Sequence, residues 1–194
     1  MDLSTLLTIK NSCLREILRR YNSANAGHIG ASLSCIDILV YLYFNIFAEG
    51  DVFILSKGHA ALALYVVLSK KGYIAEGDLE TYYKNGTLLA AHPPCNCKIK
   101  GIPFGTGSLG HGLSLATGFA FSDKFTNKNK KVFCLLSEGD CDEGSTWEAA
   151  LFAAHHKLKN LYVIIDNNNL QGFGKTEEVL NLEPLFDNTS VLLN

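Results

Sequence analysis

Charged residues are scarce in this 194-residue chain. They make up 19% of it, and 19 aspartates and glutamates slightly outnumber the 17 lysines and arginines. A formal net charge of −2 leaves no general electrostatic case for nucleic-acid binding. A hydrophobic content of 47% excludes an intrinsically disordered chain. At roughly 150 residues per domain, we expect one compact unit.

The sequence also lacks a Cys-x-x-Cys pair and an apolar run of bilayer length. Its six cysteines are irregularly spaced, which predicts reduced thiols in a cytoplasmic protein. Met1 and Asp2 lead directly into polar residues, so we expect no signal peptide. The apolar stretch from Ile38 to Phe47 is interrupted by Asn45 and is too short to span a bilayer. We therefore expect no contact with a membrane.

Short apolar runs alternate with helical patterns along the chain. The runs predict buried strands at residues 52–55, 132–136 and 161–166. Helices are expected at residues 3–21, 34–47, 60–71, 78–84, 110–121 and 144–158. This alternation predicts an α/β fold with a mainly parallel sheet flanked by helices.

Three details of these helices are open to test. Ser34 followed by Asp37 resembles a capping box at the start of the second helix. Small residues at four-residue spacing in the 110–121 helix predict a ridge that another backbone can approach, and they are Gly110, Ser114, Gly118 and Ser122. A core-facing stripe is expected on the 144–158 helix, formed by Trp147, Leu151, Ala154 and Leu158.

Polar residues follow two of the predicted strands. Glu138 and Gly139 come after the 132–136 strand, and Asn168 follows the 161–166 strand thirty positions later. The carboxyl ends of neighbouring parallel strands meet at one edge of the sheet, where α/β proteins bind ligands. Carboxylate and amide oxygens suit Mg²⁺, and Gly139 would let a diphosphate approach the backbone. On spacing alone, solvated helix caps and simple turns remain the alternative.

Four ordered motifs resemble the transketolase family of thiamine-diphosphate enzymes. The carboxylate–glycine cluster and the later Asn167-Asn168 pair resemble its thiamine-diphosphate motif. Three further loops resemble family active-site loops, at residues 26–31, 56–60 and 105–112. The resemblance runs from about residue 5 to residue 185. It implies a single diphosphate-binding domain over residues 1–194 that lacks the family's C-terminal end, with no pyrimidine-binding domain.

The resemblance also implies roles for individual residues. Glu138 lies where the family usually has an Asp metal ligand, Asn168 matches the amide ligand and Leu170 the backbone ligand. Asp140 could compete with Glu138 for the metal ion. The residues implied in binding thiamine diphosphate are His59, Gly107, Ser108, Leu109, Gly139, Asp140 and Asn168. The implied metal is Mg²⁺, with Ca²⁺ or Mn²⁺ as substitutes.

Four residues are implied in catalysis. His28, His59 and His92 match family histidines that line the cofactor and substrate channel, and imidazole suits proton transfer near neutral pH. Glu143 matches a carboxylate that links paired active sites.

The implied reaction is transfer of a two-carbon ketol unit from a ketose, or ketose phosphate, to an aldose. The partners would be a separate pyrimidine-domain chain and a second copy of this chain, forming a homodimer within a heterotetramer. A mean hydropathy of +0.12 agrees with apolar surface hidden against another subunit. Two alternatives stay open: another thiamine-diphosphate enzyme, of the deoxyxylulose-phosphate synthase or 2-oxo-acid dehydrogenase type, and a non-catalytic interaction module.

Overall fold

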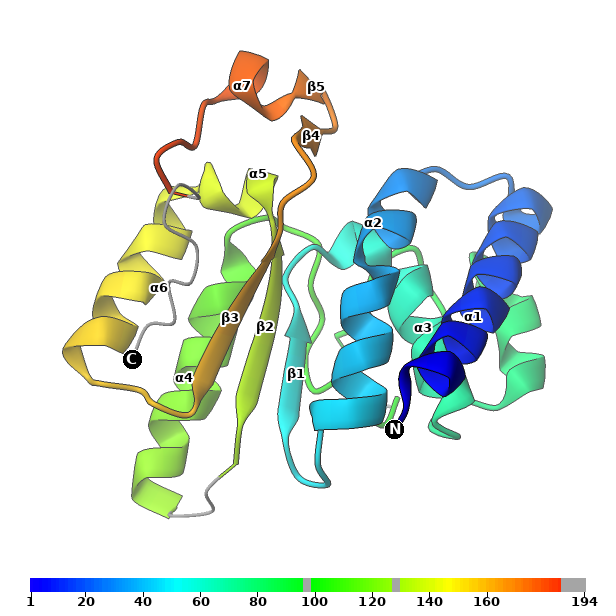
Figure 1. Cartoon of the computed structure of the whole chain (residues 1–194), viewed down its shortest axis with the longest axis horizontal. Coiled ribbons are helices and arrows are strands. Elements are labelled where there is room, and N and C mark those ends of the chain that lie inside the picture. Colours follow the sequence, from blue (N-terminus) through cyan, green and yellow to red (C-terminus); the bar gives the residue numbers. More distant parts are fainter. Residues whose placement is uncertain (96–98, 127–129, 186–194) are drawn as a thin grey trace. The chain divides into compact units, whose positions relative to one another are not determined.

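A computed structural model describes residues 1–95, 99–126 and 130–185 (Figure 1). Contacts divide the chain into two compact units. The first comprises Met1–Glu49 and Gly58–Gly107, and the second comprises Gly50–Lys57 and Ser108–Asn194. The first unit is helical and the second contains a parallel sheet. The expectation of a single domain over residues 1–194 stays a prediction.

The sheet of the second unit is parallel, with strand order β1-β2-β3. Its strands are β1 (Val52–Leu55), β2 (Val132–Ser137) and β3 (Leu161–Asp166). β2 pairs with both neighbours, and Ser137 is paired with Asp166 at the end of β2 and β3. The α/β fold with a parallel sheet is thereby confirmed, and the strands begin and end within one residue of their predicted bounds.

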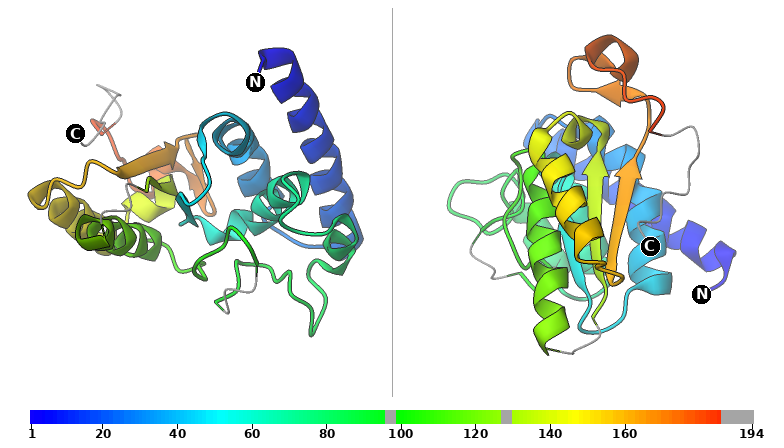
Figure 2. Two further views of the ribbon diagram at one scale, coloured as in Figure 1. Left: turned by 90° about the horizontal axis from the view of Figure 1, so that it is seen from below. Right: turned by 90° about the vertical axis from the view of Figure 1, so that its left-hand side faces the viewer.

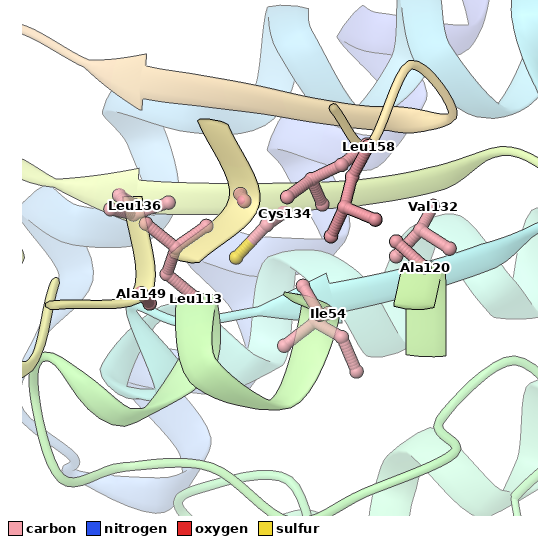
Figure 3. Packing of buried hydrophobic residues seen from close by; sticks show 11 residues of the cluster. Ile54, Leu113, Ala120, Val132, Cys134, Leu136, Ala149 and Leu158 are labelled. Atoms are coloured by element: carbon pink, nitrogen blue, oxygen red, sulfur yellow. The ribbon is translucent and has the colours of Figure 1, made fainter. Parts of the chain in front are cut away.

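Two helices cover one face of this sheet, α4 (His111–Thr126) and α6 (Gly144–His155) (Figure 2). β2 is buried from Val132 to Leu136 because alternate side chains point to opposite faces, and both faces are covered. Val132, Cys134 and Leu136 pack with apolar residues of the two helices in the core of this unit (Figure 3).

The predicted core stripe on α6 is wrong for three of its four residues. Leu158 is buried, but Trp147 is 45% and Leu151 73% exposed, and Ala154 is exposed as well. The buried side chains of α6 are Thr146, Ala149 and Ala153. Both stripes have helical spacing, so periodicity alone could not choose between them. The small residues face inward because α6 packs closely against α4.

The small-residue ridge predicted on α4 is also wrong for three of its four residues. Ser114, Gly118 and Ser122 are not buried, and a Cβ at Gly118 would have no described atom within 4 Å. Of the four predicted residues, only Gly110 is closely approached, by Glu143 and Ser145, and a second close approach occurs at Gly112, where a Cβ would overlap the side chain of Ser56. The loop that follows β1 therefore packs directly on the first turn of α4.

The first unit is built around α3 (Ala61–Lys70), whose residues are buried from Ala61 to Leu68. A helix that is apolar on all sides belongs in a core. α1 (Leu3–Ala24) and α2 (Ile29–Tyr41) both pack against it. Short helical turns complete the unit, namely η1 (Leu42–Ile46), η2 (Gly58–Ala60) and η3 (Glu76–Thr81).

α2 begins five residues before the predicted capping box. Ser34 lies inside the helix, where its hydroxyl donates to the carbonyl of Ala31 (3.2 Å), and Asp37 pairs with Lys10 (2.7 Å). A serine that bonds to its own helix in this way no longer marks a helix start.

The helix formed by α2 and η1 is also longer than the apolar run seen in the sequence. Residues Ile29–Ile46 have a mean hydropathy of 1.6, long and apolar enough to cross a membrane by length and composition alone. The core helix of a folded domain passes the same test. α2 packs on α1 and α3, with Cys35, Ile36, Leu39 and Val40 buried.

A small antiparallel hairpin follows β3, beyond the carboxyl end of the sheet (Figure 1). It consists of β4 (Leu170–Gln171) and β5 (Gly174–Lys175), and α7 (Thr176–Val179) follows directly. On the same side, β2 leads into α5 (Glu138–Cys141). Glu138 is thus the first residue of α5, and Asn168 lies in the turn between β3 and β4.

Candidate functional site

Glu138 joins the ends of β2 and β3. Its side chain is buried, and Oε2 accepts a hydrogen bond from the backbone N–H of Asn168 (2.9 Å). Oε1 accepts from the N–H of Asn169 (3.2 Å) and from the hydroxyl of Thr176 (2.7 Å). The expected convergence of the two strand ends is confirmed. The contribution of Thr176 was missed, because a threonine 38 positions away carries no recognisable signal.

The oxygen atoms at this edge keep some capacity for a cation. A carboxylate offers about four lone pairs, and the three bonds to Glu138 leave one on Oε2. The side-chain oxygen of Asn168 accepts one bond, from the N–H of Leu170 (3.0 Å), and keeps one lone pair. Hard oxygen donors of this kind suit Mg²⁺. This donor set therefore fits the implied metal.

The described residues contain no cluster of three or more His, Cys, Asp or Glu side chains that could hold a metal by itself. A metal bound at this edge would need amide, carbonyl or ligand oxygens beside the single carboxylate of Glu138. Mg²⁺ is commonly bound in this way, through one or two carboxylates and the oxygens of a phosphate substrate.

Asp140 uses its carboxylate differently. Oδ1 accepts from the hydroxyl of Ser56 (2.6 Å) and the N–H of Gly110 (2.9 Å). Oδ2 accepts from both the N–H (2.8 Å) and the hydroxyl (2.9 Å) of Ser137, which closes a capping box on α5. These four bonds occupy all its lone pairs. Asp140 can therefore hold three loops together, but it has no lone pair left for a metal ion, which favours Glu138 as the ligand.

The side chain of Gln171 lies beside Gly139 and carries a buried donor. A Cβ at Gly139 would be 3.2 Å from Cδ1 of Leu109 and 3.6 Å from Oε1 of Gln171. The Nε2 atom of Gln171 is buried, and no acceptor among the described residues reaches it. A buried N–H without an acceptor is costly, and an anion would satisfy it. The unsatisfied Nε2–H of Gln171 is therefore a candidate donor to an anion at this end of the sheet, and nothing in the sequence pattern singles out Gln171.

The three histidines lie together in the first unit. The ring centroid of His28 is 5.6 Å from that of His59 and 6.1 Å from that of His92. His28 precedes α2 in the left-handed conformation (φ 67°), and its carbonyl accepts from the hydroxyl of Tyr21 (3.2 Å). The carbonyl of His92 accepts from the hydroxyl of Tyr65 (3.0 Å). Three separate loops thus bring the predicted imidazoles into one cluster.

Burial lowers the pKa of His92, and the nearby His28 lowers it further. His92 is consequently held neutral at pH 7. In the neutral ring, one nitrogen donates a hydrogen bond and the other accepts one. Gly107 lies against the same ring, since a Cβ there would be 3.0 Å from Cδ2 of His92. The cluster therefore includes Gly107, one of the residues that were predicted to bind cofactor.

Buried thiols in the second unit are poor nucleophiles. Burial raises the pKa of Cys141 to about 12, with Asp140 adding to the effect. Burial and Asp140 also raise the pKa of Cys134. Both thiols therefore stay protonated at neutral pH. They are unreactive in this form, because the nucleophile is the thiolate.

Glu143 lies at the start of α6. It is exposed and forms no capping hydrogen bond through its side chain. Its Cβ lies 2.5 Å from where a Cβ of Gly110 would be, which places Glu143 against the predicted cofactor loop. Ser145 strengthens this contact by donating to the carbonyl of Gly110 (3.0 Å).

Comparison with known proteins gives this arrangement a context. Residues 16–184 match the family described as transketolase, thiamine diphosphate binding domain. The chain is 39% identical to an apulose-4-phosphate transketolase subunit of Phocaeicola vulgatus, over 96% of this chain and 69% of the relative. It is 37% identical to the 6-deoxy-6-sulfo-D-fructose transketolase subunit SqwG of a Clostridium species, over 88% of this chain and 65% of the relative.

A solved structure shows the same fold. The transketolase of Campylobacter jejuni superposes with a TM-score of 0.88 and 30% identity, over 94% of this chain and 31% of that chain. A parallel sheet with polar groups at its carboxyl edge defines an α/β cofactor-binding domain. The chain belongs to the transketolase family and corresponds to its thiamine-diphosphate-binding domain. It spans less than a third of the solved transketolase chain.

Proposed function

We propose that this chain is the diphosphate-binding subunit of a split transketolase, which binds thiamine diphosphate through Mg²⁺. The observation that carries the proposal is the meeting of Glu138 and Asn168 at the carboxyl edge of the sheet, with Asn168 N–H 2.9 Å from the Glu138 carboxylate. Two relatives that are themselves named as subunits, and that match this chain over most of its length, support a divided enzyme.

In this proposal, Glu138, Asn168 and the carbonyl of Leu170 hold the metal. Gly139, which has no side chain, lets the diphosphate approach its backbone, and Gln171 donates its unsatisfied Nε2–H to a phosphate oxygen. Leu109 packs beside them, and Ser108 precedes it on the same loop. Asp140 contributes indirectly, since it fixes the positions of Ser56 and Gly110.

The histidine cluster moves protons in the proposed reaction. Bound thiamine diphosphate supplies the carbanion chemistry that transfers a two-carbon unit. His92 is kept neutral by burial, so it can accept a proton from a substrate hydroxyl at pH 7. His28 and His59, whose ring centroids are 5.6 Å apart, orient the same substrate through hydrogen bonds.

The partner is a chain that carries the pyrimidine-binding domain. We also propose a homodimer of this chain within the heterotetramer. Glu143, whose family counterpart links paired sites, lies at the start of α6, and this helix exposes Trp147 and Leu151. We propose that this apolar face is buried against a second copy of the chain.

Sugar phosphates are the proposed substrates. One relative is named for apulose-4-phosphate and another for 6-deoxy-6-sulfo-D-fructose, so the related subunits differ in the ketose that they serve. Both names describe a ketose with an anionic group at its far end. We therefore propose a ketose of this kind as donor and an aldose as acceptor.

Calorimetric titration of Mg²⁺ and thiamine diphosphate tests the proposal, with and without the pyrimidine-domain chain. The complex should bind the cofactor, and Glu138→Gln should weaken binding by more than about 100-fold. Asn168→Ala provides a second variant, because the Asn168 side chain is exposed and holds one backbone bond. Glu177→Gln, an exposed carboxylate on α7, is the matched control and should bind normally.

Failure of the wild-type complex to take up cofactor would contradict the proposal and favour a non-catalytic interaction module. Product analysis then separates the enzymes that share this cofactor. Two-carbon transfer from a ketose phosphate agrees with the proposal. Consumption of pyruvate without ketol transfer would favour the deoxyxylulose-phosphate synthase or 2-oxo-acid dehydrogenase type.

A further inference from the structure

Thr176 connects three parts of the proposed metal site. Its hydroxyl donates to Oε1 of Glu138 at 2.7 Å, the shortest of the three hydrogen bonds to that carboxylate among the described residues. Its backbone N–H donates to the carbonyl of Asn169 (3.1 Å). Thr176 is itself buried and begins α7. One residue thus fixes the carboxylate, the turn after β3 and the short helix.

The bond from Thr176 decides which oxygen of Glu138 is available. Oε1 accepts from Thr176 and Asn169, which occupies both of its lone pairs. Oε2 accepts from Asn168 and keeps one lone pair. A dication at this edge can therefore be bound by Oε2 but not by Oε1 without breaking a hydrogen bond.

A fixed carboxylate matters because glutamate has one more rotatable bond than aspartate. Its carboxylate reaches about 1.5 Å further and loses more conformational freedom when it binds an ion. The hydroxyl of Thr176 reduces this loss, because it holds the side chain in place before the ion arrives.

We propose that Thr176 is a positioning residue for the metal site, which holds Oε1 of Glu138 so that Oε2 binds the dication through one oxygen. The inference rests on the proposed function, because it assumes that Glu138 is a metal ligand. It adds a residue that neither the motifs nor the spacing of the sequence indicated.

Two substitutions at Thr176 distinguish the effect of its hydroxyl from the effect of its side-chain shape. Thr176→Val keeps the shape and removes the donor, whereas Thr176→Ser keeps the donor. Hydrogen exchange of the chain without metal should show the amides of Asn168 and Asn169 exchanging about tenfold faster in Thr176→Val. Thr176→Ser should exchange like the wild type. Equal exchange in all three proteins would overturn the inference.

Mn²⁺ binding to the complex with the pyrimidine-domain chain and thiamine diphosphate gives the second measurement. Electron paramagnetic resonance measures the bound Mn²⁺. Thr176→Val should raise the dissociation constant for Mn²⁺ about tenfold, and Thr176→Ser should restore the wild-type value. If wild type binds Mn²⁺ and Thr176→Val binds it equally well, Thr176 has no positioning role and the proposed function stands. If wild type binds no Mn²⁺, the proposed function itself fails.

A double-mutant cycle with Glu138→Asp tests whether Thr176 acts through Glu138. The aspartate carboxylate would end about 1.5 Å short of the position of the glutamate carboxylate, beyond hydrogen-bond reach of the Thr176 hydroxyl. Thr176→Val should therefore change Mn²⁺ affinity less than about twofold in that background. An undiminished tenfold effect in the Glu138→Asp protein would contradict action through Glu138 and assign the loss to a general change in the fold.

Discussion

Two buried acidic residues, Glu138 and Asp140, lie two positions apart and have different surroundings. The sequence predicted that both could compete for one ion. Their distinction depends on donors from distant segments, Ser56 and Gly110 for Asp140 and Thr176 for Glu138. Spacing along the chain cannot show which hydrogen-bond donors will contact each carboxylate in the fold. The sequence therefore predicted the region of the site, but not which of the two carboxylates keeps a lone pair for a metal ion.

Asp140→Asn should destabilise the protein by about 2–3 kcal/mol. The amide group keeps the size of the carboxylate, but its NH₂ would face at least one donor, from Ser137, Ser56 or Gly110. Urea denaturation followed by circular dichroism measures the change. Asp78→Asn, an exposed position, is the control and should stay within about 0.5 kcal/mol of the wild type. Equal stability of the two variants would contradict the role of Asp140.

His28→Asn should raise the pKa of His92 while leaving it below its ordinary value. Burial is the main cause of the lowered pKa and remains, whereas the repulsion from His28 is removed. Asparagine is chosen because it tolerates the left-handed conformation of His28. Titration of the imidazole carbons by nuclear magnetic resonance measures the change. An unchanged or lower pKa would show that the two rings do not interact.

The same lowered pKa sets the direction of the pH dependence. The unfolded chain binds a proton at His92 near pH 6.5, where the folded protein still keeps the ring neutral. The free energy of unfolding should therefore decrease as the pH falls below about 6.5. His92→Gln should reduce this decrease in urea denaturation between about pH 7 and pH 5.5, and a decrease of the same size would contradict the assignment.

Among the elements, strands were easier to predict than helices. A buried parallel strand is apolar on both faces, and β1 and β3 have the predicted bounds. The starts and faces of helices were harder to place. Ser34 bonds within α2 instead of capping it, and α6 turns its small residues towards α4. On α6, tertiary packing decided between two stripes that have the same period.

Two glycines of α4 provide a matched pair of substitutions. Gly118→Ala should stabilise the protein by about 0.5–1 kcal/mol, because the added methyl meets no described atom within 4 Å and alanine favours the helix. Gly112→Ala should destabilise it by about 1–3 kcal/mol, because the methyl would overlap Ser56. Thermal denaturation measures both. A Gly112→Ala protein as stable as the wild type would contradict the packing of the β1 loop on α4.

For the whole molecule, the sequence predicted the family and the fold class better than which surfaces are exposed. The motifs pointed to one edge of the sheet, and the structure brings Glu138 and Asn168 together there. The apolar face of α6 was instead assigned to the core, since a sequence pattern cannot separate a core face from one that meets another chain. Trp147 and Leu151 are exposed in this single chain.

Leu151→Glu should disrupt the proposed homodimer. A charge on the exposed apolar face of α6 would lose its hydration in the interface, but it would leave the separate chain folded. Light scattering after size-exclusion chromatography should show a smaller species, with an unchanged circular dichroism spectrum. Lys159→Glu, exposed beyond the end of α6, is the control and should keep the assembly. A Leu151→Glu protein of wild-type size would exclude this face from the interface.

The central claim is that the ends of β2 and β3 hold one dication through Glu138 and Asn168. Anomalous diffraction from crystals of the complex with Mn²⁺ and thiamine diphosphate tests it most directly. We predict one manganese peak about 2.1 Å from Oε2 of Glu138 and from Oδ1 of Asn168, with the diphosphate beside Gly139. A manganese peak away from these two oxygens, or bound cofactor with no metal between them, would contradict the account.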